Sequence, residues 1–261
     1  MAENTAEHAR AAEAARTDAG TDAAPLVVAV DGPSGSGKSS VSREVARRLG
    51  AAYLDTGAMY RAVAWHCLDS GVDLADPEAI LEAARTMPLT QSTHPDEDVV
   101  LVGEADVTEA IRGAEVTDVV STVAVVIPVR EELRRRQRAA IADAGRMVAE
   151  GRDITTVVAP DAHARVLLTA SEAVRTARRS GQLAAAGEPG VDAGTLNRQV
   201  VGRDARDAAV STFDRPAEGV VFVDSTELDF EQTVAAVMAA VEEQAGEAAR
   251  GARPAEKGQG R

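Results

Sequence analysis

A glycine-rich loop that follows an apolar strand is the feature that most constrains this chain. Residues 26–31 read L-V-V-A-V-D, and residues 32–39 continue as G-P-S-G-S-G-K-S. A helical pattern comes next, with Val41, Val45 and Leu49 on one face. Glycines let the backbone N–H groups of such a loop turn inward, where they and the helix N-terminus bind anionic oxygens. The chain is therefore expected to bind a nucleoside triphosphate.

The loop pattern assigns a task to each of its residue types. Lys38 is expected to reach the β- and γ-phosphates, and Ser39 is expected to ligate Mg²⁺. An ordinary glycine-rich turn would match the same letters, but the strand before the loop and the helix after it favour phosphate binding. The residues expected to contact the triphosphate are Gly32, Pro33, Ser34, Gly35, Ser36, Gly37, Lys38, Ser39 and Ser40.

Short apolar runs separated by helical patterns predict an α/β doubly wound core with a five-stranded parallel sheet. Ligands of such sheets bind outside the carboxyl ends of the strands, and polar residues cluster at those ends in this chain. The expected strands, after the first at 26–31, are Ala51–Asp55, Arg146–Glu150, Arg165–Leu168 and Val220–Asp224. The polar strand ends are Asp31-Gly32, Asp55-Thr56-Gly57, Gly151-Arg152-Asp153 and Asp224-Ser225.

Two insertions interrupt this expected core, which comprises residues 25–56, 145–170 and 210–244. The segment 57–144 is too long for a simple crossover, and V-V-L-V at 99–102 predicts a small antiparallel sheet among helices. The arginine-bearing segment 171–209 contains glycine breaks at Gly181 and within 187–194, which suits a mobile helical lid.

The two ends of the chain have few side chains that could be buried. Residues 1–24 are rich in alanine and charged residues, and residues 245–261 are rich in alanine, glycine and charged residues, so both are expected to be disordered tails. Residues 1–24 also lack the apolar stretch of a secretion signal.

Composition excludes several classes of protein. A net charge of −14 argues against binding nucleic acid, because that needs a basic face. The expected ligand is itself anionic, so cationic groups must gather locally around it. No run approaches the ~18 apolar residues of a membrane helix. Cys67 is the single cysteine, which rules out an intrachain disulfide, and its neighbours predict a buried helix face. We expect a cytoplasmic monomer that binds neither nucleic acid nor membrane.

Five segments taken together resemble the bacterial cytidylate kinases. The similarity extends from about residue 26 to about residue 240. It implies transfer of the γ-phosphate of ATP to CMP or dCMP with Mg²⁺, in a fold of core, monophosphate-binding insertion and lid. The segments are D-G-P-S-G-S-G-K-S-S at 31–40, L-D-T-G-A-M-Y-R at 54–61, D-V-T-E-A-I-R at 106–112, V-V-S-T-V-A-V-V-I-P-V-R-E-E-L-R-R-R-Q-R at 119–138 and E-G-R-D-I-T at 150–155.

The resemblance also implies roles for individual residues. Asp153 would accept a hydrogen bond from the exocyclic amino group of cytosine and would leave uracil, which presents a carbonyl there, unpaired. Lys38, Arg61 and Arg152 are implied as catalytic residues, and planar guanidinium groups suit phosphate oxygens. The implied CMP site consists of Thr56, Ser121, Arg130 and Asp153 at the base, Tyr60, Arg61 and Arg152 at the phosphate, and Arg203 and Asp207 at the sugar.

The lid would contribute further cations. Arg178 is expected to bind the ATP phosphates, and Arg175 and Arg179 share its helical spacing. A solvated charged face would have the same spacing.

Most of these residues have a purely structural alternative. Thr56 and Asp153 lie where helix N-caps occur, and Ser121 could be an ordinary polar helix residue. Arg61 and Arg130 fall in helical patterns where solvated arginine is common.

Other classes of protein share the phosphate-binding loop. A GTPase switch would carry N-K-x-D, and neither Asn4 nor Asn197 begins that motif. An ATPase motor would carry an apolar strand that ends in paired acids, and this chain lacks such a strand pattern. A kinase of another small acceptor would share both loop and lid, and only the segment 121–153 argues against it.

One position departs from the family. Many cytidylate kinases carry an arginine where this chain has Val210, in R-D-A-R-D-A-A-V at 203–210. We expect Arg206, one helical turn earlier on the same face, to supply the missing guanidinium. Arg215 fits less well, because F-D-R-P at 213–216 is typical of a helix exit.

Overall fold

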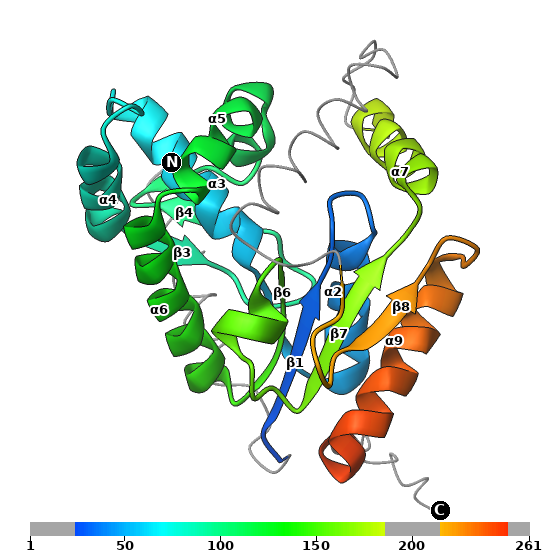
Figure 1. Cartoon of the computed structure of the whole chain (residues 1–261). Coiled ribbons are helices and arrows are strands. Elements are labelled where there is room, and N and C mark those ends of the chain that lie inside the picture. The colour runs from blue at the N-terminus through cyan, green and yellow to red at the C-terminus, as the bar shows by residue number, and fades with distance from the viewer. Residues whose placement is uncertain (1–23, 186–214, 250–261) are drawn as a thin grey trace, which may run out of the picture.

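A computed structural model describes residues 24–185 and 215–249 (Figure 1). Within these ranges five parallel strands form one sheet in the order β2-β6-β1-β7-β8. The strand that precedes the glycine-rich loop is therefore central in the sheet. The predicted sheet is confirmed, and each strand end lies within one residue of the predicted one. The strands are β1 (Leu26–Asp31), β2 (Ala52–Asp55), β6 (Arg146–Gly151), β7 (Ala164–Thr169) and β8 (Val221–Asp224).

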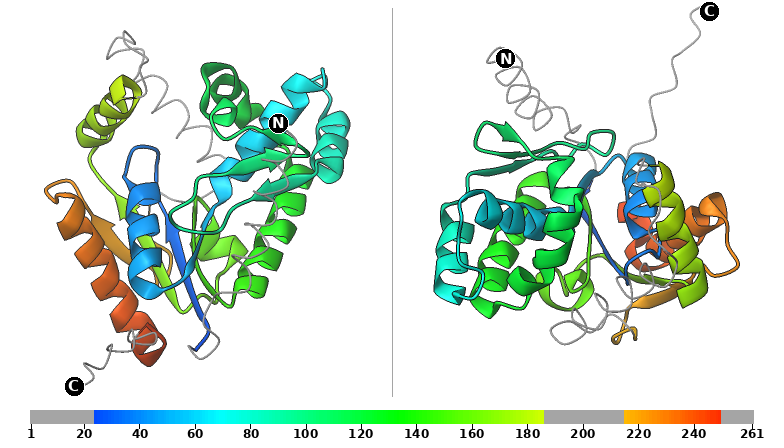
Figure 2. Two further views of the ribbon diagram at one scale, coloured as in Figure 1. Left: turned by 180° about the vertical axis from the view of Figure 1, so that it is seen from behind. Right: turned by 90° about the horizontal axis from the view of Figure 1, so that it is seen from above.

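Helices cover both faces of the sheet, so successive side chains of the central strand enter different cores. Figure 2 shows helices on both sides of the sheet. Val28 and Val30 pack against α2 (Lys38–Leu49) and α9 (Phe230–Ala245), whereas Ala29 belongs to the opposite core. The predicted apolar face of α2, with Val41, Val45 and Leu49, is buried.

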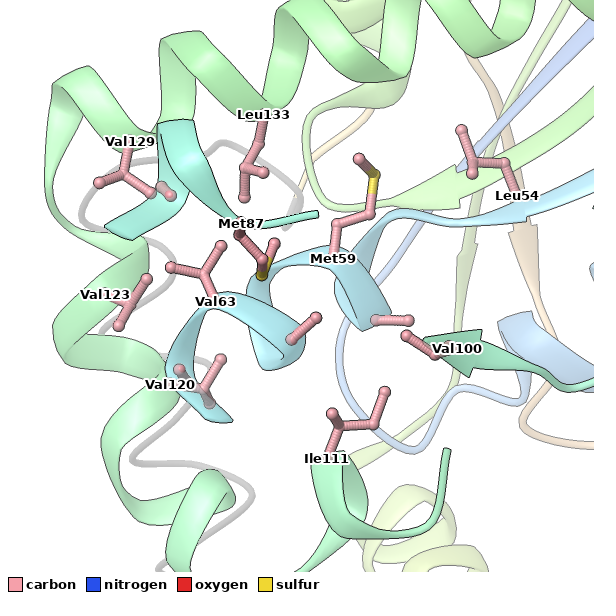
Figure 3. Close-up of a cluster of buried hydrophobic side chains, with 14 of the residues drawn as sticks. Leu54, Met59, Val63, Met87, Val100, Ile111, Val120, Val123, Val129 and Leu133 are labelled. Atoms are coloured by element: carbon pink, nitrogen blue, oxygen red, sulfur yellow. The ribbon is translucent and has the colours of Figure 1, made fainter. Parts of the chain in front are cut away.

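The insertion supplies the second core. Met59 and Val63 of α3 lie among Met87, Val120 and Leu133 from neighbouring segments (Figure 3). A three-stranded antiparallel sheet joins these helices, as the sequence predicts. The insertion contains α3 (Thr56–Asp69), α4 (Pro77–Thr86), β3 (Leu89–Gln91), β4 (Val100–Val102), β5 (Ala105–Asp106), the 3-10 turn η1 (Ala110–Arg112), α5 (Ala114–Ala124) and α6 (Ile127–Ala144).

Two boundaries differ from those expected. Gly181 lies inside the continuous helix α7 (Glu172–Ala185), so the predicted break is wrong at this position; one glycine costs a helix only about 1 kcal/mol. At the other end, α9 is followed by the 3-10 turn η3 (Gly246–Ala249), and Ala249 is buried. The packed chain thus extends past the expected boundary at residue 244.

Two expectations from composition can be compared with the structure. Cys67 is fully buried in the core of the insertion, as predicted. Among the helices of the described ranges, none is both long enough and apolar enough to cross a bilayer.

Candidate active site

A cavity of about 770 Å³ lies at the carboxyl ends of β1, β2 and β6, between the glycine-rich loop and the insertion. This is the edge of the sheet where the sequence predicts ligand binding. The predicted site residues in its wall are Ser34, Gly35, Gly37, Lys38, Ser39, Ser40, Thr56, Tyr60, Arg61, Ser121, Arg130, Arg152 and Asp153.

Four of the predicted residues lie elsewhere in the described part of the chain. Gly32, Pro33, Ser36 and Arg178 are not in the cavity wall. Arg203, Asp207, Arg206 and Val210 lie outside the described residues, as does the rest of the predicted lid from residue 186 to 209.

The glycine-rich loop presents a helix N-terminus to the cavity. Helix α2 begins at Lys38, two residues earlier than predicted, and Gly37 precedes it with a left-handed φ of 88° that favours glycine. Gly32 has a different task, because a Cβ atom there would overlap the carbonyl oxygen of Leu168 on β7. Gly32 therefore allows close packing of the loop on the sheet and does not line the cavity.

Glu150, at the end of β6, is a residue of the cavity wall that the sequence analysis missed. Its buried carboxylate accepts a hydrogen bond from the Tyr53 hydroxyl at 2.8 Å, and the Ser39 hydroxyl also donates to it. The ammonium group of Lys38 lies 3.9 Å away. Burial, and then the charge of Asp55, raise the pKa of Glu150. The loop and strand β6 thus meet at a buried carboxylate.

Asp55, at the end of β2, connects the sheet to α3. Its carboxylate caps that helix by accepting from Ala58 N at 3.0 Å, and it also accepts from Arg61 Nη2 at 2.8 Å. Burial opposes its ionisation, but the charges of Arg61 and Arg112 lower the pKa of Asp55. Thr56 is not the cap, because its hydroxyl donates to the carbonyl oxygen of Glu150 at 2.7 Å.

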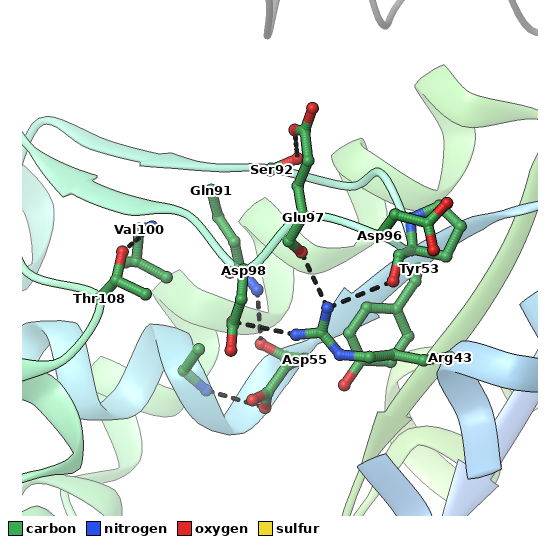
Figure 4. Close-up of polar contacts among 12 residues, drawn as sticks. Arg43, Tyr53, Asp55, Gln91, Ser92, Asp96, Glu97, Asp98, Val100 and Thr108 are labelled. Atoms are coloured by element: carbon green, nitrogen blue, oxygen red, sulfur yellow. Dashed lines mark hydrogen bonds and ion pairs between the residues drawn. The ribbon is translucent and has the colours of Figure 1, made fainter. Parts of the chain in front are cut away.

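Two arginines of the wall are tied to the loop that precedes β4, and Figure 4 shows the first of them, Arg43, among residues of that loop. Arg43 stacks on the Tyr53 ring, 4.5 Å from its centroid, and donates to the carbonyl oxygen of Glu97 at 2.8 Å. Asp98 pairs with Arg43 at 2.9 Å and with Arg112 at 2.8 Å. Positive charge is therefore gathered at this cavity even though the whole chain is acidic.

Asp153 is buried at the start of η2 (Ile154–Val158), a π-helical turn after β6, and is surrounded by guanidinium groups. Its Oδ2 accepts from Arg130 Nη2 at 2.7 Å and from Arg134 Nη2 at 2.6 Å. Its side chain makes no capping hydrogen bond. The helix-cap interpretation of Asp153 is therefore wrong, and so is the solvated-face interpretation of Arg130, whose side chain is 6% exposed. Arg134 is a second partner that the sequence analysis did not identify.

The segment that carries Arg152 and Asp153 is anchored by Asp31. The Asp31 carboxylate accepts from the backbone N–H groups of Ile154 and Thr155 at 2.9 and 2.8 Å, and from the Thr155 hydroxyl at 2.6 Å. Burial, which outweighs these hydrogen bonds, raises the pKa of Asp31 to about 6. Strand β1 therefore fixes both the start of the glycine-rich loop and the turn that holds Asp153.

The arginines of α7 have two different surroundings: Arg175 and Arg178 contact the glycine-rich loop, and Arg179 lines the cavity. Arg178 donates to the carbonyl oxygen of Ser36 and to Ser225 Oγ, each at 3.0 Å, and Arg175 donates to the carbonyl oxygen of Ser34 at 2.9 Å. These contacts hold α7 against the back of the loop. Arg179 lines the cavity instead. Adjacent helical residues point about 100° apart, which agrees with the different surroundings of Arg178 and Arg179.

Comparisons with known proteins agree on one family. The model of the family described as cytidylate kinase matches residues 28–243. A cytidylate kinase of Cutibacterium acnes is 50% identical over 215 residues, which cover 82% of this chain and 95% of that protein. A cytidylate kinase of Rhodococcus opacus is 49% identical over 223 residues, or 85% of this chain and 96% of that protein.

A solved structure from Thermus thermophilus shows a weaker likeness. It is 18% identical, covers 83% of this chain and 97% of its own, and has a TM-score of 0.39. That score is too low to bear on the fold, which rests on the strands and helices described above.

Proposed function

This chain belongs to the cytidylate kinase family, and we propose that its cavity binds ATP beside CMP or dCMP and transfers the γ-phosphate, giving ADP and CDP or dCDP. The observation that supports this most is that one cavity is lined both by the glycine-rich loop and by Arg61, Arg152 and Asp153. A phosphate donor and a pyrimidine monophosphate would then share a single enclosure.

The ATP side of the cavity consists of the loop amides, Lys38 and the N-terminus of α2. Oriented N–H groups and a helix N-terminus stabilise phosphate charge, and Lys38 can follow that charge as it moves between the β- and γ-phosphates. The cavity also fits Mg²⁺, which takes hard oxygen ligands and shares them with substrate phosphates. Ser39 would hold the ion, with the adjacent carboxylate of Glu150 available to its water shell. When bound, Mg²⁺ would neutralise phosphate charge.

The acceptor phosphate is assigned to Tyr60, Arg61 and Arg152. Arg61 Nη2 donates to Asp55, but its Nε is buried and has no hydrogen-bond partner among the described residues. A buried donor without an acceptor is costly, by about 1–3 kcal/mol. A phosphate oxygen at this point would satisfy it, and Asp55 would hold the guanidinium in place.

The base is assigned to Thr56, Ser121, Arg130 and Asp153. All four are buried, and all line the cavity. The Asp153 carboxylate accepts a hydrogen bond from the amino group of cytosine. Uracil presents a carbonyl oxygen there and leaves this buried carboxylate unpaired.

Phosphoryl transfer through a loose transition state needs alignment and charge compensation more than a protein base. The cations of the cavity supply both, because they hold donor and acceptor phosphates in line. Exclusion of water prevents loss of ATP by hydrolysis, and the lid segment that includes α7 is assigned this role.

An ADP-release assay over a panel of nucleoside monophosphates tests the proposal. We expect turnover of CMP and dCMP with ATP and Mg²⁺, and much less with UMP. Equal turnover of UMP, AMP and GMP, or nucleotide hydrolysis without an acceptor, would contradict it. The cytoplasmic location and the monomeric state stay predictions. Size-exclusion chromatography with light scattering tests the monomeric state.

A further inference from the structure

Two arginines from one helix converge on a single oxygen of Asp153. Arg130 and Arg134 are one turn apart on α6, so they share a face. Arg130 Nη2 and Arg134 Nη2 lie 2.7 and 2.6 Å from Asp153 Oδ2, and Arg134 Nε lies 3.1 Å from the same atom. Among the described residues, no hydrogen bond ends on Oδ1. One oxygen is thus held by α6, and the other is left to accept from a ligand.

The two arginines differ in what else they can reach. Arg130 lines the cavity, lies 5.7 Å from the centroid of the Tyr60 ring and donates through Nη1 to the carbonyl oxygen of Ala124. Arg134 is not in the cavity wall, and its Nε and Nη2 both donate to Asp153. Arg130 can therefore contact a bound base, whereas Arg134 acts only through the carboxylate.

The acceptor Asp153 Oδ1 and the donor Arg130 match the hydrogen-bonding edge of cytosine. Cytosine offers an amino donor beside the acceptors N3 and O2, so its partner must place an acceptor next to a donor. Asp153 Oδ1 and the Arg130 guanidinium form such a pair. When Arg130 turns part of its hydrogen bonding to the base, Asp153 Oδ2 still needs a cation, because a buried carboxylate without one is strongly disfavoured.

We propose that Arg134 is a positioning residue for base selection: it holds Asp153 Oδ2, which keeps Oδ1 toward the amino group and frees Arg130 to donate to the base. The inference rests on the proposed function, since it takes cytosine as the base. It adds to the site a residue that touches neither substrate.

Kinetics of Arg134→Gln and Arg134→Lys test this inference, with kcat and KM measured for CMP and UMP at saturating ATP. We expect Arg134→Gln to lower the CMP:UMP ratio of kcat/KM by about tenfold, mainly through a higher KM for CMP. Arg134→Lys keeps the charge but loses the two-donor contact, so it should restore part of the ratio. The KM for ATP should not change.

Arg135→Gln is the matched control. Arg135 is the next residue of α6, its side chain is 68% exposed, and its ion pair is with Glu132. This variant removes the same charge from the same helix without touching Asp153, so its CMP:UMP ratio should equal that of the wild type. In an Asp153→Asn background, Arg134→Gln should change the ratio no further, because the two residues act as a unit.

The outcomes separate this inference from the proposed function. A wild-type enzyme that does not phosphorylate CMP would contradict the proposed function itself. A wild-type ratio in Arg134→Gln, together with a lost ratio in Asp153→Asn, would overturn only the role of Arg134, even if the variant melts at a lower temperature. If Arg134→Gln does not fold, Arg134→Lys decides, and an unchanged ratio in that variant would overturn the inference.

Discussion

The ammonium nitrogen of Lys38 lies 3.9 Å from Oε2 of Glu150, so the lysine of the glycine-rich loop is directed at the end of strand β6. Glu150 is 2% exposed and is also bonded to Tyr53 and Ser39. This ion pair orients the Lys38 side chain together with a contact inside the loop, in which the ammonium group donates to the carbonyl oxygen of Pro33 at 3.5 Å. The triphosphate is expected to compete with Glu150 for the ammonium group.

Lys38→Ala should lower kcat for CMP by about 10²–10³, because the variant lacks the charge that follows the transferring phosphate. The variant should remain folded, because the Tyr53 hydroxyl still donates to Glu150. The measurement is steady-state kinetics with CMP and ATP. Arg47→Ala is the control, since Arg47 is a half-exposed cation at the far end of α2. Near-normal turnover by Lys38→Ala would mean that the loop holds nucleotide for another purpose.

Asp153→Asn should weaken discrimination between CMP and UMP by about 1–3 kcal/mol, because an amide can donate to the O4 carbonyl of uracil. The measurement is the ratio of kcat/KM for the two substrates. Asp161→Asn, at an exposed aspartate after η2, removes a nearby charge outside the cavity and should leave the ratio unchanged. A wild-type ratio in Asp153→Asn would limit Asp153 to a structural role.

The sequence predicts most of this site because the site lies at the ends of strands. Short apolar runs separated by helical patterns locate the strands, and the parallel arrangement brings their carboxyl ends to one edge. The loop, Thr56 and Arg152–Asp153 could be placed in this way, since each directly follows a strand.

The sequence could not identify Glu150 or Arg134. Glu150 stands inside the strand pattern, and only the neighbouring loop shows that its side chain meets Lys38. Arg134 belongs to the run R-E-E-L-R-R-R-Q-R at 130–138. Which arginines of that run face Asp153 depends on how α6 packs beside β6, and a local pattern does not contain that information.

Asp31 should make stability fall as pH rises. Its pKa is raised to about 6 in the fold from an ordinary value of 3.8, so between these values the folded protein binds more protons than the unfolded chain. The free energy of unfolding therefore decreases over this range. The measurement is urea denaturation of wild type and Asp31→Asn. The unfolding free energy of the wild type minus that of the variant should decrease from about pH 4 to about pH 6.5. A difference independent of pH would contradict this assignment.

Glu132 should have the opposite dependence. It accepts from Arg135 and Arg136, and Arg136 in turn donates to the carbonyl oxygens of Ala84 and Met87 at the end of α4. The hydrogen bond from Arg135, more than that from Arg136, lowers the pKa of Glu132 to about 2 from an ordinary 4.5. The unfolded chain then binds more protons between these values, so stability present above about pH 4.5 is lost as pH falls.

Glu132→Gln removes this titration while keeping the shape of the side chain. The excess unfolding free energy of wild type over Glu132→Gln should be largest above about pH 5 and should shrink toward pH 3.5, the reverse of the Asp31→Asn comparison. Urea denaturation across this range is the measurement. Because Glu132 lies outside the cavity wall, the CMP:UMP ratio should stay at the wild-type value. Parallel stability curves for the two proteins would show that Arg135 and Arg136 do not stabilise the ionised carboxylate in solution.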